Sequence, residues 1–144
     1  MSIAKVFFDY AQAFERVFED DDWSQLEEFF TPDAVYLPGD GKELRGRDNV
    51  FAHLKQSLDS FDRRFDVRRV DVVSDPVVTA SRVTFQWRAA YEKKGLPGIA
   101  LCGSEEATFE GNAISRLEDS LDDGVAETLQ TWIGQYGDNL GISG

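Results

Sequence analysis

Apolar side chains in the first part of the chain recur at intervals of three and four, the spacing of one helical face. The first such set runs from Ser2 to Glu19 and comprises Val6, Phe7, Tyr10, Phe14, Val17 and Phe18. Aspartates at 20–22 provide capping groups for a second, short helix, which we expect to end before Pro32 because proline disfavours helical geometry in the preceding residue. The same spacing predicts a third helix over 48–61.

The pattern changes beyond Phe61, where Val, Thr, Phe, Trp and Tyr alternate with polar residues as in half-buried strands. Four long strands are predicted, over 65–73, 77–91, 99–109 and 113–121. Turn residues separate them at Asp75-Pro76, Glu92 to Gly98 and Glu110-Gly111-Asn112. The second half of the chain is therefore predicted to be an antiparallel meander.

Shorter elements complete the prediction. A small strand at 35–37 and a second piece near 42–45 flank the turn residues Pro38-Gly39-Asp40-Gly41. After Gly124, apolar residues return to helical spacing, which predicts a closing helix and a frayed glycine-rich tail. Helices followed by an antiparallel sheet favour an α+β fold, and 144 residues suit one domain over 1–144, with the helices packed on one sheet face.

Charge and composition narrow the classes of partner. The net charge of −12 repels nucleic-acid phosphates and anionic lipid surfaces, so we expect neither nucleic acid nor a membrane as partner. Cys102 is the one cysteine and no long apolar span is present, which favours a cytoplasmic protein without a disulfide. Eleven Phe, three Trp and four Tyr suit either a packed core or the wall of a cavity for flat apolar ligands.

Metal and cofactor chemistry are not indicated. A single histidine and a single cysteine cannot form the usual nitrogen and sulfur ligand sets. The sequence also has no glycine-rich phosphate loop after a strand and no nucleophile elbow. We therefore expect no metal and no cofactor.

The run from Asp22 to Tyr36, followed by Leu44 to Val50 and placed after an amphipathic helix, resembles the NTF2-like superfamily, in particular its SnoaL-like branch. Relatives in this superfamily include ketosteroid isomerase, limonene epoxide hydrolase and polyketide cyclases. The resemblance implies a cone-shaped, cystatin-like fold in which N-terminal helices pack on a strongly curved, mostly antiparallel sheet. It also implies a deep pocket for a small apolar molecule and a homodimer formed through the outer sheet face.

Two comparisons within the superfamily suggest site residues. In ketosteroid isomerases a carboxylate base follows the first strand, and a tyrosine and a protonated aspartate bind the substrate oxygen. By resemblance the base position here holds Pro38, the tyrosine position holds Phe14, and the third position falls near Glu105. Two of the three groups are therefore missing, and Glu105 remains as a candidate.

Limonene epoxide hydrolase gives a second correspondence. Its late-strand aspartate matches Asp119, its water-positioning tyrosine matches Tyr36, and its arginine matches Arg88. Ala90 stands where that enzyme has a second aspartate, so the pair of acids that would orient a water molecule is incomplete. Asp119 lies on the more apolar face of its strand, and it is either an acid or base of raised pKa or a carboxylate at the rim.

Strand alternation suggests which side chains line the pocket. Trp87 shares a face with the aromatic residues of its strand, whereas Arg88 lies on the other face unless a bulge reverses the alternation. Phe109 shares a face with Glu105. The candidate ligand contacts are therefore Trp87, Arg88 and Phe109 from the strands and Tyr10, Phe14 and Trp23 from the helical segments.

His53 is the side chain whose unperturbed pKa lies nearest neutrality, and it stands at the edge of the third helix stripe. It is either a catalytic group at the pocket mouth or a hydrogen-bonded structural histidine. Tyr10 likewise either donates a hydrogen bond into the pocket or packs within the first helix face.

Three functions fit these observations. The first is a cofactor-independent enzyme of the isomerase, cyclase or hydrolase type, in which Asp119 acts as acid or base with help from His53, Tyr36 or Glu105. The second is a non-catalytic domain that binds a small apolar molecule. The third is a dimerisation module whose pocket is filled by its own aromatic side chains.

Overall fold

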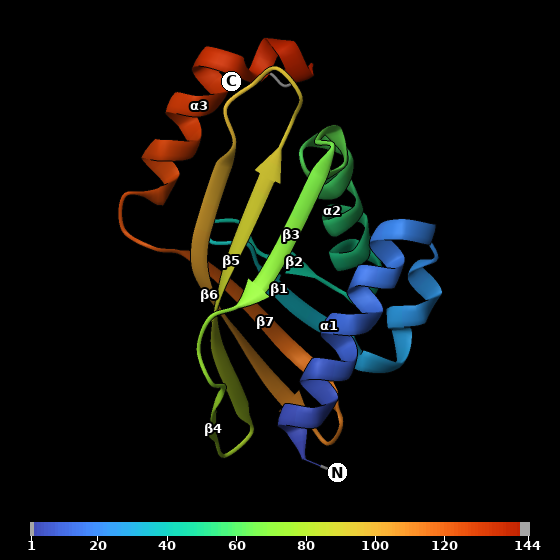
Figure 1. Ribbon diagram of the computed structural model, residues 1–144. Coiled ribbons are helices and arrows are strands. Elements are labelled where there is room, and N and C mark those ends of the chain that lie inside the picture. The colour runs from blue at the N-terminus through green and yellow to red at the C-terminus, as the bar shows by residue number, and fades with distance from the viewer. Residues whose placement is uncertain (1, 142–144) are drawn as a thin grey trace.

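The computed structural model describes residues 2–141, which form an α+β fold (Figure 1). Its helices are α1 (Ile3–Asp20), the 3-10 helix η1 (Trp23–Phe29), α2 (Arg47–Ser60), the 3-10 helix η2 (Asp62–Arg64) and α3 (Val125–Leu140). Its strands are β1 (Phe30–Leu37), β2 (Leu44–Arg45), β3 (Val67–Val72), β4 (Val77–Thr79), β5 (Arg82–Glu92), β6 (Ile99–Glu110) and β7 (Ala113–Leu121).

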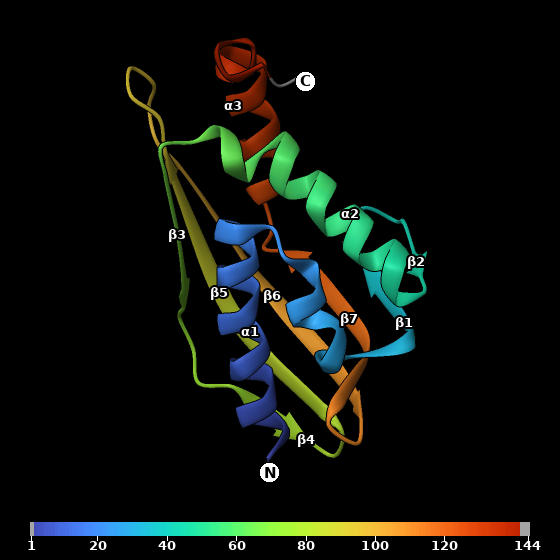
Figure 2. The same ribbon diagram turned by 90° about the vertical axis from the view of Figure 1, so that its right-hand side faces the viewer.

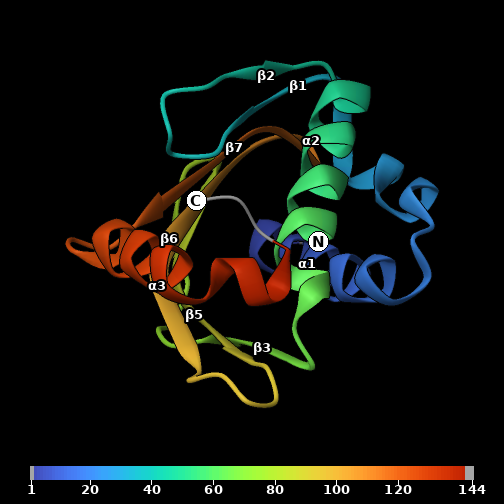
Figure 3. The same cartoon turned by 90° about the horizontal axis from the view of Figure 1, so that it is seen from above.

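The strands form one curved sheet in the order β2-β1-β7-β6-β5-β3, with β4 paired to β5. Neighbouring strands are antiparallel except β1 and β7, which run parallel. This pair places the first strand of the chain beside the last. Viewed from above, the sheet curves around α1 and α2 (Figure 3). The predicted curved, mostly antiparallel sheet with helices on one face is thus confirmed.

Helices α1 and α2 cover the concave face of the sheet (Figure 2). The Ser2 hydroxyl caps α1 by accepting a hydrogen bond from the Lys5 amide at 3.2 Å. Behind this cap, α1 buries Val6, Phe7, Tyr10 and Val17 of the predicted apolar face, together with Ala13. These side chains belong to the first and larger apolar cluster, which also includes residues of α2, β1 and β7.

A second apolar cluster lies where α3 packs on β5 and β6. Trp132 of α3 is buried there beside Tyr91 and Leu101, and its indole N–H donates to the Pro97 carbonyl at 3.1 Å. Arg64 of η2 ties the end of α3 in place by donating to the Leu140 carbonyl at 2.9 Å. The predicted closing helix is therefore confirmed, and the predicted frayed tail at 142–144 lies outside the described residues.

Two boundaries differ from the prediction. The short helix η1 ends at Phe29, before Pro32 as predicted, but β1 begins at Phe30 and not at residue 35, so Pro32 lies inside the strand. It falls between Phe30 and Val35, where the register to β7 shifts, so its missing amide hydrogen interrupts no regular ladder. The predicted strand over 77–91 is in fact the hairpin of β4 and β5, which turns at Ala80 with a positive φ of 51°.

No helix within residues 2–141 is long and apolar enough to span a membrane.

Gly103 of β6 permits a close approach between strands, because Trp87 of β5 is its cross-strand partner. A Cβ atom on Gly103 would lie 2.7 Å from the Trp87 ring and would also collide with the backbone carbonyl of Ser120. We expect Gly103→Ala to destabilise the fold by about 1–3 kcal/mol, since the Ser120 backbone has to move. The free energy of unfolding, measured by denaturant titration, checks this.

Gly134→Ala provides the matched control, since Gly134 lies inside α3 and an added Cβ meets no atom within 4 Å. We expect this variant to gain about 0.5–1 kcal/mol from helix propensity. Equal effects of the two substitutions would contradict the proposed role of Gly103.

Candidate functional site

A cavity of about 350 Å³ lies between the concave face of the sheet and helices α1 and α2. Trp87, which packs against both apolar clusters, forms part of its wall. Aromatic side chains provide much of the rest: Tyr10, Phe14, Tyr36, Phe85 and Tyr91. The volume lies at the lower end of the usual range for small-molecule pockets, roughly 300–1,000 Å³.

Three polar side chains from three strands meet in the cavity. The Tyr36 hydroxyl of β1 donates to the Asp119 carboxylate of β7 at 2.5 Å. Glu105 of β6 is the cross-strand partner of Asp119, and its carboxyl also lines the cavity. Parallel pairing of β1 with β7 places Tyr36 opposite Leu117, so its hydroxyl reaches the residue two positions further along β7. We call Tyr36, Glu105 and Asp119 the acidic cluster.

The surroundings of the acidic cluster favour its neutral forms. Burial raises the pKa of Glu105 well above its ordinary value, and the nearby charge of Asp119 and a hydrogen bond to it act in the same direction. The pKa values of the Tyr36 and Tyr10 phenols are also raised, first by burial and then by the neighbouring carboxylates. The fold thus favours the protonated form of the Glu105 carboxyl beside Asp119 and the protonated form of both phenols.

A second group of polar side chains lines another part of the same cavity. Arg68 of β3 pairs with Asp62 of η2 at 2.8 Å and with Glu15 of α1 at 2.6 Å. The Tyr91 hydroxyl of β5 donates to Asp62 at 3.1 Å. The Arg68 side chain is only 8% exposed, and its guanidinium lies 4.6 Å from the centre of the Phe18 ring. We call Arg68, Asp62, Glu15 and Tyr91 the arginine cluster.

The arginine cluster is absent from the candidates drawn from the sequence. Its members come from α1, η2, β3 and β5, and no local spacing connects them. One signal in the sequence could have indicated it. Arg68 lies on the same face of β3 as Val70 and Val72, and all three line the cavity. An arginine on the apolar face of a predicted strand indicates a buried charge that needs partners.

Several predicted ligand contacts lie at the cavity and others do not. Tyr10, Phe14 and Trp87 line it. Phe109 is instead buried in the first apolar cluster, with its ring centre 6.5 Å from that of Phe7. Trp23 packs between Phe14 and α2, and its indole N–H donates away to Asp21 at 2.9 Å.

Arg88 and His53 are placed outside the cavity lining. Arg88 is exposed on the opposite face of β5 from Trp87, so the regular strand alternation holds there and no bulge turns its side chain inward. His53 of α2 is half-buried and packs on the Tyr36 ring with centres 5.9 Å apart. It therefore contacts a member of the acidic cluster from outside.

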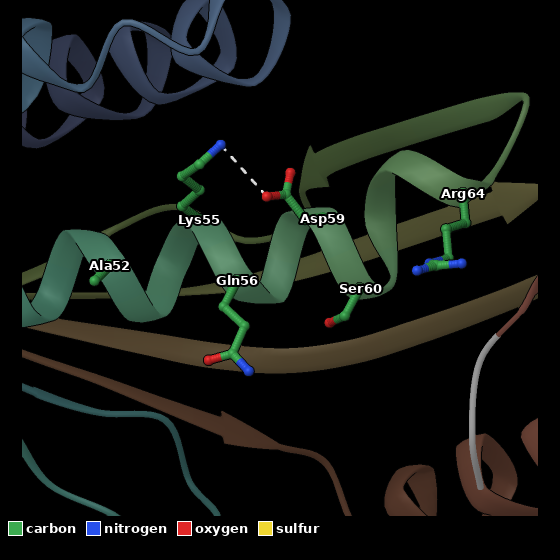
Figure 4. A pocket seen from close by; sticks show the side chains of 6 residues that line it. All are labelled: Ala52, Lys55, Gln56, Asp59, Ser60 and Arg64. Atoms are coloured by element: carbon green, nitrogen blue, oxygen red, sulfur yellow. Dashed lines mark ion pairs between the residues drawn. The ribbon is translucent and has the colours of Figure 1, made fainter.

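Another depression, shown in Figure 4, runs along the outer side of α2 and η2. Its side chains belong to these two consecutive helices alone, and the Lys55–Asp59 pair at 3.4 Å lies one helical turn apart on the surface. No strand or second layer contributes a group, so this depression offers no converging chemistry. Among residues 2–141, no group of three or more His, Cys, Asp or Glu is placed to hold a metal ion.

The acidic cluster holds a proton donor and a proton acceptor side by side. The Glu105 carboxyl, whose raised pKa favours the protonated form, can donate to a ligand oxygen, and the Asp119 carboxylate, which accepts from Tyr36, can serve as the acceptor. Neighbouring carboxyl groups with different proton occupancy are a recurrent arrangement for acid-base chemistry. The cavity thus combines apolar walls with one site suited to proton transfer.

Comparison with known proteins agrees with this architecture. The model of the SnoaL-like domain family matches residues 11–121. A search of curated proteins found no match. Among solved structures, an NTF2-like protein of unknown function from Burkholderia pseudomallei K96243 is 17% identical, with a TM-score of 0.71 over 92% of this chain and 98% of its own.

Two further solved structures are similar in fold. A putative SnoaL-like polyketide cyclase from Jannaschia sp. CCS1 is 16% identical, with a TM-score of 0.65 over 86% of this chain and 90% of its own. TerC, co-crystallised with polyporic acid, is 16% identical, with a TM-score of 0.64 over 88% of this chain and 97% of its own. The family match spans most of the chain, and the NTF2-like neighbour agrees with it in fold, so the chain belongs to the SnoaL-like domain family.

Proposed function

We propose that this protein is a cofactor-independent enzyme that transfers a proton on a small, mostly apolar molecule bearing a carbonyl or hydroxyl group. The observation that carries the proposal is the Glu105–Asp119 carboxyl pair, held with Tyr36 in an aromatic-walled cavity. The fold neighbours include a putative polyketide cyclase and a protein co-crystallised with polyporic acid, which supports a small organic ligand.

The proposed step keeps the charge of the carboxyl pair constant. The Asp119 carboxylate removes a proton from the carbon next to a ligand carbonyl, and the C–H electron pair forms a C=C bond. The carbonyl oxygen takes the proton of Glu105 and becomes an enol hydroxyl. The pair begins and ends with one proton, so no additional charge is created in the cavity.

The enol then completes one of several reactions. Return of a proton to a different carbon gives isomerisation, and attack of the enol carbon on a second carbonyl gives ring closure. Both use the same two carboxyl groups, which is why the reaction class is proposed here as proton transfer.

Tyr36 acts as a positioning residue in this proposal. Its hydroxyl donates to one oxygen of Asp119 at 2.5 Å and so holds that carboxylate in place beside Glu105. His53 packs on the Tyr36 ring and can fix its orientation. Tyr10 lies against the same cavity, and its phenol provides a further hydrogen-bond donor for the ligand oxygen.

The third function considered above, a dimerisation module, requires a pocket that is filled by the protein's own aromatic side chains. Phe14 and Trp87 instead line a cavity that stays open, and Trp23 lies outside its lining, which favours a ligand. The homodimer, the cytoplasmic location and the lack of a nucleic-acid partner remain predictions.

Solvent hydrogen exchange tests the proposal without knowledge of the product. The protein is incubated with 2-tetralone, a bicyclic ketone, in D₂O, and deuterium at the carbons next to the carbonyl is followed by mass spectrometry. We expect the protein to exchange these hydrogens faster than buffer alone. In Asp119→Asn this protein-dependent rate should fall about 100-fold or more, since that variant lacks the base.

Glu118→Gln is the matched control for this experiment. It removes a neighbouring carboxylate from β7 that lies outside the cavity lining, so its exchange rate should equal that of the unsubstituted protein. Binding of the ketone without any added exchange would instead assign the cavity to ligand binding alone.

The raised pKa of Glu105 predicts a pH dependence of stability. In the folded protein Glu105 stays protonated at pH values where the unfolded chain has ionised it, above about 4.5. The folded state then binds more protons, so stability falls as pH rises, by up to about 1.4 kcal/mol per pH unit until the folded pKa is reached. Glu105→Gln does not titrate and avoids this loss.

Unfolding free energies at pH 5 and pH 7.5 check this prediction. We expect the advantage of Glu105→Gln over the unsubstituted protein to grow with pH by at least about 1 kcal/mol. Glu106→Gln removes the next carboxyl on the same strand, outside the cavity lining, and serves as the control. Parallel pH curves for Glu105→Gln and the unsubstituted protein would show that Glu105 is not held neutral by the fold.

A further inference from the structure

We propose that the cavity selects its ligand by charge, accepting neutral and cationic molecules and excluding anions. The inference rests on the proposed function only in taking this cavity as the ligand site. It narrows the substrate class to compounds without a carboxylate, phosphate or sulfate group. The argument comes from the charges that line the cavity and from the way they are paired.

Acidic side chains outnumber basic ones in the cavity wall. Four carboxyl groups line it, from Glu15, Asp62, Glu105 and Asp119, and Arg68 is the one basic side chain among the described lining residues. With Glu105 protonated, the remaining three carboxylates and one guanidinium leave a net charge of about −2. An anion that enters such a partly buried space meets repulsion that water screens poorly.

The single cation is already neutralised by its partners. Arg68 forms ion pairs with both Asp62 and Glu15, and its guanidinium stacks on the Phe18 ring. An anionic ligand would have to displace one of these carboxylates and leave it without its cation. Arg68 is therefore not an anchor for an anion but a counter-ion for the protein's own acids.

Asp119 has no such counter-ion among residues 2–141. Its hydrogen-bond donor is the neutral Tyr36 hydroxyl, and its cross-strand neighbour Glu105 is also an acid. A ligand that brings a positive charge to Asp119 supplies what the described residues of the protein do not. The negative faces of the Trp87 and Tyr10 rings lining the same space attract cations as well.

Three probes of equal shape and different charge test the proposal. At about pH 7, 2-naphthylmethanol is neutral, 2-naphthylmethylamine is a cation and 2-naphthoate is an anion. We measure each dissociation constant by isothermal titration calorimetry. We expect the alcohol and the amine to bind and the naphthoate to bind at least about tenfold more weakly than the alcohol.

A pair of charge-matched variants locates the source of the selection. Asp119→Asn and Glu118→Gln each remove one negative charge from β7, the first inside the cavity and the second outside its lining. We expect Asp119→Asn to reduce the ratio of the affinity for the alcohol to that for naphthoate at least about threefold. The same variant should bind the amine more weakly. Glu118→Gln should leave the alcohol-to-naphthoate ratio and the affinity for the amine unchanged, because we attribute the selection to charge inside the cavity and not to the net charge of the protein.

Naphthoate binding as tightly as the alcohol, or equal shifts in the two variants, would overturn the proposal. The same holds if neither the alcohol nor the amine binds. These outcomes are separate from the fate of the proposed function, because hydrogen exchange is measured on a neutral ketone. A protein that catalyses exchange but binds naphthoate tightly keeps its enzymatic function and loses the charge selection.

Discussion

The division of the core into two apolar clusters along one face of a curved sheet is the constraint on which the rest of this structure depends. One cluster forms under α1 and α2 and the other under α3, and Trp87 packs against both. The side chains of the two clusters do not close over the space between them, and the cavity remains there. Gly103 lets the Trp87 ring lie close to β6, so the wall of the cavity is set by backbone contacts as well as by side-chain volume.

The cavity places two unlike polar groups in one space. In the arginine cluster every carboxylate is near a cation, and Arg68 links α1, η2 and β3 through its ion pairs. In the acidic cluster Glu105 and Asp119 are cross-strand partners with no cation from residues 2–141 paired to them, and the pKa of Glu105 is raised. The first arrangement stabilises structure, and the second is the kind found where protons are moved.

Much of the fold was predictable because its helices and strands have regular apolar periods, as in α1 and β5. Tyr36, Glu105 and Asp119 were reached through family resemblance, whereas Arg68, Asp62 and Glu15 were missed, because tertiary contacts between distant elements bring them together. Ala80 was missed because a positive φ at alanine leaves no glycine or asparagine signal. Phe109 lies on the expected face but in the core and not at the cavity, because strand alternation gives a side and not a depth. Arg88 follows the predicted alternation, and the bulge that would have made it a ligand contact is absent from β5.

The parallel pairing of β1 with β7 also bears on when the cavity forms during folding. Tyr36 and Asp119 are 83 residues apart in the chain, and their strands can pair only after β7 has been synthesised. Contacts of such sequence separation close late, since loop entropy opposes them until the intervening strands are in place. In a growing chain on the ribosome, the hydrogen bond from Tyr36 to Asp119 therefore forms only once β7 has docked beside β1, so the acidic cluster is the last part of the cavity to be completed.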